Sequence, residues 1–98
     1  MNLDDIFTAS PRIYNVKIDK DIPEDAVNCM RPSKFGNPYK AYSEADRNIV
    51  CDKFEEYVRN NKEFQILIKK ELKGKHLKCC CHPKRCHCLT LLRVANED

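Results

Sequence analysis

The residues best suited to chemistry are concentrated near the C-terminal end of the sequence. Five of the seven cysteines lie in the segment Cys79–Cys88 (CCCHPKRCHC), together with two of the three histidines. On a strand, Cys79 and Cys81 project from the same face. Pro83 then turns the chain, so that one or more of the following residues return to lie opposite this pair: Cys86, His87 or Cys88. Because zinc takes four tetrahedral ligands from thiolate and imidazole groups, this spacing predicts a zinc site.

Two other interpretations of these cysteines stay open. Cysteines on a buried strand pack as small apolar side chains, which accounts for Cys79 and Cys81 without any metal. Alternatively, Cys86 is a reactive thiolate with His87 as its proton carrier, because neighbouring cations and the start of a helix favour an anion. Under this last interpretation the two residues are catalytic, and Cys86 reacts faster with alkylating agents than Cys51, which belongs to the core.

A second segment, Arg31–Tyr39 (RPSKFGNPY), contains the residue types of an anion-binding loop. Arg31 offers a planar guanidinium to phosphate or carboxylate, and Lys34 adds a point charge. Gly36 permits close approach of a ligand to the backbone, and Asn37 supplies an amide. We expect these four residues to bind the ligand, with an aromatic ring of the loop stacked on a base. The alternative is an ordinary turn whose aromatic residues anchor the core.

The distribution of charge favours an anionic partner. The formal net charge of the 98 residues is +3. Residues 29–40 contain three cations and no acid, and residues 67–88 contain seven cations and a single acid. We expect these two basic segments to form one face that meets phosphate groups, as in a nucleotide or a nucleic acid.

The cysteine count and the N-terminal residues predict a protein of the cytoplasm. The start, Met1–Asp5, is acidic where a secretory signal is basic and then apolar. An odd number of cysteines without such a signal favours metal or thiolate chemistry over a disulfide scaffold. No apolar run approaches the ~18 residues of a membrane span, so we expect no membrane partner.

The elements that must position these residues follow from hydrophobic periodicity and from turn signals. Alternation predicts strands at 12–18 and 76–81, and we expect a second, short strand at 26–30. Apolar stripes at helical spacing predict helices at 44–59, at 64–72 and from 86–89 onward, the first opened by a capping box at Ser43 and Asp46, and the second followed by Gly74. The sequence therefore predicts an α/β fold in one small domain over residues 1–98, with a short sheet of two to four strands and about three helices.

Taken together, the loop RPSKFGNPY and the later pattern CxCxPxxCH, which runs from Cys79 to His87, resemble a bacterial and phage family known as domain of unknown function 4326. The resemblance covers residues 12–95. Members of that family have an aromatic residue at the position of Cys80 and a small one at the position of Cys88, which implies that these two thiols lie outside any shared site. The resemblance thus implies a metal site of the remaining candidates: Cys79, Cys81, Cys86 and His87. It also implies that the loop and the cysteine turn meet around a common pocket.

Three functions are consistent with these features. The leading hypothesis is a small cytosolic domain that binds a phosphate-bearing ligand, a nucleotide or a nucleic acid, at a pocket formed by the basic loop and the Cys/His cluster, with zinc as cofactor. The second is an enzyme that acts on a nucleotide or base through a cysteine or a metal-bound water. The third is a phage effector that binds a host protein through its surface.

Overall fold

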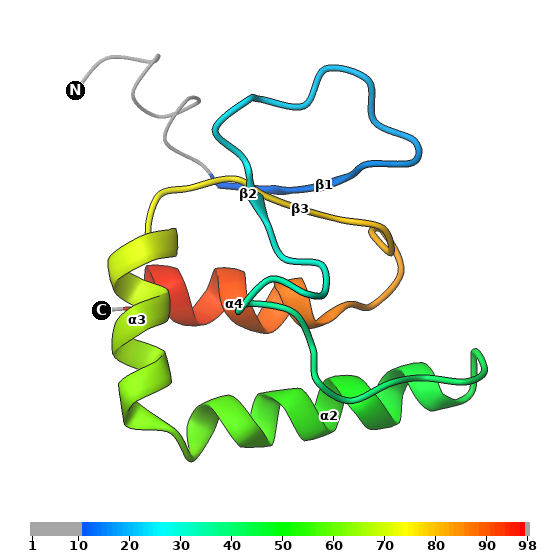
Figure 1. The fold of residues 1–98 in the computed structure, drawn as a ribbon, viewed down its shortest axis with the longest axis vertical. Helices are drawn as coiled ribbons and strands as arrows, with labels where there is room; N and C mark the ends of the chain where they lie inside the picture. The colour runs from blue at the N-terminus through cyan, green and yellow to red at the C-terminus, as the bar shows by residue number, and fades with distance from the viewer. Residues whose placement is uncertain (1–10, 98) are drawn as a thin grey trace.

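The computed structural model describes residues 11–97 of the chain, and Figure 1 shows their arrangement. In chain order the elements are β1 (Ile13–Asn15), β2 (Val27–Asn28), α2 (Asp46–Arg59), α3 (Lys62–Leu72), β3 (Leu77–Cys79) and α4 (His87–Asn96). The predicted α/β class is therefore confirmed, with a three-stranded sheet and three helices in the described residues. The acidic start at Met1–Asp5 lies outside the described residues.

The sheet is parallel throughout, and β3 is its central strand. Leu77 of β3 lies opposite Ile13 of β1 on one side and Val27 of β2 on the other. Because all three strands run in the same direction, their carboxyl ends meet at one edge of the sheet. This edge carries Asn15 at the end of β1, Cys79 at the end of β3, and the residues that follow β2. Ligands of open parallel α/β sheets bind at this kind of edge.

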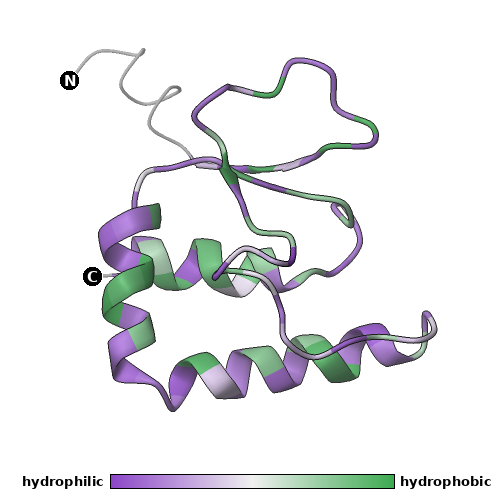
Figure 2. Cartoon of the chain, viewed as in Figure 1, coloured by the Kyte–Doolittle hydropathy of each residue, from purple (hydrophilic) through white to green (hydrophobic). Residues whose placement is uncertain are grey.

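Helix α4 occupies the centre of the molecule, between the sheet and α2 (Figure 1). It contacts β1, β3 and both other helices, and its residues Leu91 and Ala95 are fully buried. Apolar residues run along α3 and α4, where the two helices pack against each other (Figure 2). Burial of these side chains supplies the main stabilisation of so short a sheet. Within residues 11–97, none of the helices combines the length and the apolar character needed to cross a membrane.

All three predicted strands are shorter in the structure than expected. The first ends at Asn15, because the Asn15 side chain accepts a hydrogen bond from the Lys17 amide (2.8 Å) and the Asp19 carboxylate accepts one from the Asn15 amide (2.6 Å). The second ends at Asn28, whose side chain accepts a hydrogen bond from the Met30 amide (2.9 Å). Such local side-chain bonds compete with the ladder of a sheet. The third ends at Cys79, and the chain then turns so that the Cys81 carbonyl accepts a hydrogen bond from the Lys84 amide (2.9 Å).

The two long helices begin differently. The predicted capping box at the first helix is wrong, because α2 starts after Ala45 without a side-chain cap and the Asp46 carboxylate instead accepts a hydrogen bond from the Tyr42 amide (3.1 Å). Helix α3 has a side-chain cap, since Asn61 accepts a hydrogen bond from the Phe64 amide (3.0 Å). Gly74 follows α3 with a φ of 73°, the left-handed conformation typical of a helix end.

We predict that Asn61→Ala lowers the free energy of unfolding by about 1 kcal/mol, since the substitution removes the cap of α3. Asn60→Ala is the matched control, because that neighbouring side chain is exposed and caps no helix start. It should change the free energy by less than about 0.5 kcal/mol. Urea denaturation of both variants measures the difference, and equal effects would contradict the assignment of the cap.

Candidate functional site

The segments that follow β2 and β3 face each other across a pocket of about 470 Å³. The first contributes residues of the predicted anion-binding loop, the second contributes residues of the cysteine turn, and α2 forms the remaining wall. Three arginines line the pocket, and no Asp or Glu of residues 11–97 does. We call it the arginine pocket; its arginines are Arg31, Arg47 and Arg85.

A hydrogen bond from the Arg31 side chain to the backbone of the same loop holds the guanidinium at the pocket. The Arg31 Nη1 donates to the Asn37 carbonyl at 2.9 Å. Gly36 allows this closure, because a Cβ at that position would lie 2.9 Å from the Arg31 backbone nitrogen. Asn37 is buried, its Nδ2 donates to the Val50 carbonyl (3.2 Å) and its Oδ1 accepts from the Tyr39 amide (2.9 Å). Gly36 and Asn37 therefore shape the loop and attach it to α2.

The other two arginines of the pocket are paired with acids. The Arg47 Nε lies 2.8 Å from the Glu44 carboxylate, which raises the pKa of Arg47, and the Arg85 Nη2 lies 2.7 Å from the Asp52 carboxylate, which raises the pKa of Arg85. Arg31 has no such partner among residues 11–97. Of the three arginines of the pocket, Arg31 is therefore the one whose positive charge is not balanced by a carboxylate of residues 11–97.

Arg47 was not among the binding residues expected from the sequence. The residue lies on the face of α2 that also presents Val50 and Cys51 to the pocket, at positions i, i+3 and i+4. The sequence signal for this site was the presence of a cation, Arg47, and a thiol, Cys51, on the same helical face. The signal was missed because the stripe of core residues on the same helix dominated the pattern.

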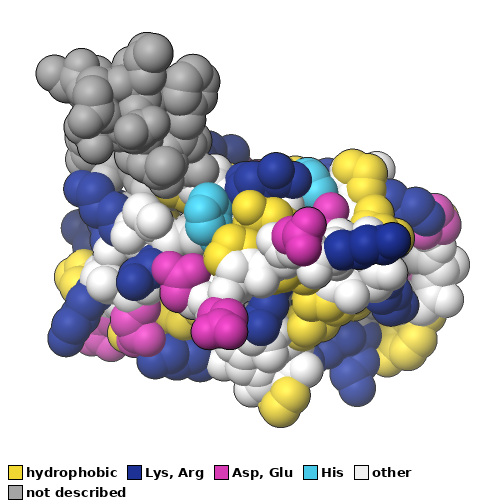
Figure 3. Space-filling model, turned by 90° about the horizontal axis from the view of Figure 1, so that it is seen from above, with side chains coloured by type: hydrophobic (Ala, Val, Ile, Leu, Met, Phe, Trp, Pro, Cys, Tyr) yellow, Lys and Arg dark blue, Asp and Glu magenta, His cyan; other side chains and the backbone are white. Residues whose placement is uncertain are grey.

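Lys34, the other cation of the loop, lies outside the arginine pocket. Its Nζ forms an ion pair with the Glu71 carboxylate of α3 at 2.7 Å. On the face shown in Figure 3, Lys and Arg side chains are interspersed with Asp and Glu side chains. Of the two basic segments, Arg31 and Arg85 are the cations that meet at the pocket.

Beneath the pocket lie three buried thiols whose sulfur atoms are all within 4.8 Å of one another. They come from the end of β3, the N-cap of α4 and the first turn of α4, and no side chain among them is more than 4% exposed. We call them the cysteine trio; its members are Cys79, Cys86 and Cys88. Three sulfur ligands at this separation can hold a metal ion.

Hydrogen bonds within the cysteine trio favour a negative charge on one of its sulfurs. Donation from the Cys86 and Cys88 thiols lowers the pKa of Cys79, and the backbone amides of Cys81 and His82 lower it further. Contact with Cys79 raises the pKa of Cys86, and contact with neighbouring thiols and burial raise the pKa of Cys88. Within the trio, these contacts favour the thiolate form at Cys79 and the thiol form at Cys86 and Cys88.

The structure brings together two of the four predicted metal ligands, Cys79 and Cys86, and leaves Cys81 and His87 outside the group of close sulfurs. Because the strand ends at Cys79, the Cys81 side chain turns to the pocket and contacts the Arg47 guanidinium. Cys88, which the family resemblance had set aside, completes the trio, since the first turn of α4 directs it inward.

His87 connects the start of α4 to the loop after β2. Its Nε2 lies 2.8 Å from the Cys29 carbonyl and 3.0 Å from the Phe35 carbonyl, so this nitrogen carries the proton and donates. Burial lowers the pKa of His87 and so favours the uncharged ring. The Nδ1 lies 3.5 Å from the Cys86 sulfur, so the predicted catalytic pair is in contact, with a buried thiol whose pKa is raised.

Comparison with known proteins assigns the chain to a family. The model of the family described as Domain of unknown function (DUF4326) matches residues 14–97, and the chain therefore belongs to that family. No curated protein and no solved structure matches the chain.

We predict that Cys80 is the first thiol to react with iodoacetamide in the native protein, because it is exposed while the cysteine trio is buried. Mass mapping of time points at neutral pH measures the order of labelling, and Cys80→Ser should remove the fast phase. Modification of Cys86 as fast as that of Cys80 would contradict the burial described here and would favour the reactive thiolate expected from the sequence.

Proposed function

We propose that this member of the DUF4326 family binds a phosphate-bearing ligand, a nucleotide or a nucleic acid, in the arginine pocket. The observation that carries the proposal is the Arg31 guanidinium, which lines the pocket without a carboxylate partner in residues 11–97. A guanidinium matches the geometry of phosphate oxygens and forms strong charge-assisted bonds with them. The pocket volume of about 470 Å³ lies within the range of small-molecule sites.

The remaining wall of the pocket suits the rest of a nucleotide. Tyr39 lines the pocket with its ring partly exposed, and an exposed aromatic ring provides a stacking surface for a base. Met30 and Val50 add apolar surface. Arg47 and Arg85, although paired with acids, contribute positive potential near the Arg31 guanidinium and extend the binding site beyond one contact.

The cofactor in this proposal is zinc, held by the cysteine trio. Buried thiolates are the ligands that zinc takes in structural sites. The backbone amides of Cys81 and His82 lower the pKa of Cys79, which favours its thiolate form. Such donors stabilise the charge of a metal-bound thiolate and orient it.

One observation favours an enzyme as a second candidate function. The Cys86 sulfur and the His87 Nδ1 are 3.5 Å apart, and both residues line the pocket. A thiol nucleophile needs a lowered pKa and access to its substrate. Cys86 is 4% exposed and its pKa is raised, so we prefer binding to catalysis.

We predict that Arg31→Ala weakens the binding of a nucleoside monophosphate by about 10-fold to 100-fold, the equivalent of a lost charge-assisted bond of roughly 1.5–3 kcal/mol. Lys34→Ala is the matched control, since it removes the same charge from the same loop but outside the pocket. The control should change the affinity by less than about 3-fold at moderate salt, where distant charges are screened.

Calorimetric titration with the four ribonucleoside monophosphates, inorganic phosphate and a short single-stranded RNA tests the proposal. Binding of the RNA alone, with a steep dependence on salt, identifies a nucleic acid as the ligand. Equal losses in both variants place the site elsewhere on the surface. Absence of binding by every probe at low salt contradicts the proposal and favours the effector that binds a host protein.

A further inference from the structure

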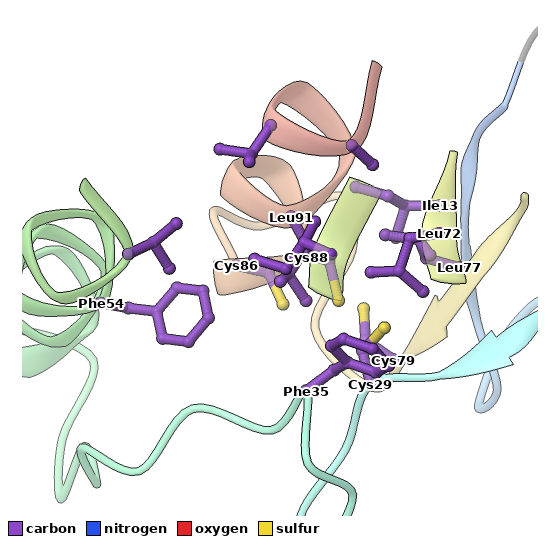
Figure 4. Packing of buried hydrophobic residues seen from close by; sticks show 14 residues of the cluster. Ile13, Cys29, Phe35, Phe54, Leu72, Leu77, Cys79, Cys86, Cys88 and Leu91 are labelled. Atoms are coloured by element: carbon purple, nitrogen blue, oxygen red, sulfur yellow. The ribbon is translucent and has the colours of Figure 1, made fainter. Parts of the chain in front are cut away.

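A fourth buried thiol lies beside the cysteine trio. Cys29 follows β2 directly, its side chain is 0% exposed, and its thiol lies beside the Cys88 thiol. In Figure 4 the Cys29 side chain points toward the sulfurs of the trio. All seven cysteines, Cys29 included, are free thiols.

We propose that Cys29 completes a four-thiolate zinc centre with the cysteine trio, and that zinc in this centre is required for ligand binding in the arginine pocket. The inference rests on the proposed zinc of the trio and on the proposed pocket, and it adds the fourth ligand and the dependence of one site on the other.

The other nearby candidates for the fourth ligand are already engaged. The His87 Nε2 donates to two carbonyls, and its Nδ1 faces the Cys86 sulfur. The Cys81 side chain contacts the Arg47 guanidinium on the pocket side. The Cys29 thiol is less engaged, because it donates only a weak bond to the Val27 carbonyl at 3.5 Å and lies beside the Cys88 thiol. Four thiolates in a tetrahedron make a closed, structural zinc site.

The surroundings of the four sulfurs suit the negative charge that such a centre carries. The N-terminus of α4, a helix of ten residues, lies at the same place and adds its positive end. Binding of Zn²⁺ displaces the thiol protons, which pass to water.

The position of Cys29 gives this centre a consequence for the pocket. Cys29 lies two residues before Arg31, and its carbonyl accepts the hydrogen bond from His87. A zinc ion shared by Cys29 and the trio therefore fixes the beginning of the anion-binding loop to both β3 and α4. Loss of the ion leaves the loop attached at this end by the His87 bonds and by short strand pairing. The orientation of Arg31 then becomes less restricted, and ligand affinity falls.

The first experiment measures zinc affinity of the untagged chain by competition with a chromophoric chelator. Cys29→Ser should weaken zinc binding by ~100-fold or more. Loss of a residue that only hydrogen-bonds to a metal ligand lowers metal affinity less, by about 10-fold to 100-fold. Cys51→Ser is the matched control, because Cys51 is a buried thiol at the pocket wall outside the trio. It should leave the affinity within about 3-fold of wild type, as expected of a group that does not touch the metal.

A second measurement uses the wild-type chain and does not depend on the folding of a variant. The chain loaded with Co²⁺ in place of zinc should show thiolate-to-cobalt charge-transfer absorption of the intensity given by four thiolates. An intensity typical of three thiolates, or a Cys29→Ser variant that keeps wild-type zinc affinity, overturns the assignment of Cys29.

The third measurement links the two sites. Chelation of zinc should weaken the binding of the nucleoside monophosphate used above by at least ~10-fold, and added zinc should restore it. Unchanged affinity overturns the dependence of the pocket on zinc.

A chain that binds the nucleotide but holds no zinc overturns the zinc centre and leaves the phosphate pocket intact. A chain that holds zinc through Cys29 but binds no phosphate ligand contradicts the proposed function and the dependence on zinc, while the centre stands.

Discussion

The convergence of buried sulfur atoms at the carboxyl edge of the sheet is the constraint on which the rest of the structure depends. The strands are only two or three residues long, so their hydrogen bonds contribute little order to the fold. The end of β3 and the start of α4 are instead held together by thiols that are packed without exposure to solvent. Cysteine buries less apolar area than leucine or phenylalanine, and a core that places several thiols at one point gains less from the hydrophobic effect. A metal ion at this point would supply the missing stabilisation.

The same short turn serves the buried thiols on one side and the arginine pocket on the other. Cys79 and Cys86 belong to the cysteine trio and also line the pocket. His87 reaches from the start of α4 to the carbonyls of the loop that carries Arg31. The geometry of the sulfur cluster and the position of the Arg31 side chain are thus set by one group of contacts, which accounts for the proximity of the two motifs in space despite their separation in sequence.

The helices and their order were predictable from the sequence, because each depends on local spacing. The apolar stripe of α3 and the glycine that follows it are visible within a short window of residues. The strand ends were not predictable in this way, since the bond between Asp19 and the Asn15 amide stops β1 within an otherwise alternating pattern.

Which cysteines form the sulfur group depends on where β3 ends. A strand that stops at Cys79 turns Cys81 toward Arg47 and leaves the inner position to Cys88. The sequence assigned both cations of the loop to the ligand, whereas the fold pairs Lys34 with Glu71 of α3 and places Arg31 at the pocket.

X-ray absorption spectroscopy at the zinc edge tests the central claim most directly, because it reports the number and kind of atoms bound to the metal in the intact chain. The account predicts a single shell of four sulfur atoms at about 2.3 Å. It also predicts no scattering from an imidazole ring, since both nitrogens of His87 face other partners. A shell of three sulfurs with one nitrogen at about 2.0 Å, or a chain purified without bound metal that takes up none, would contradict it.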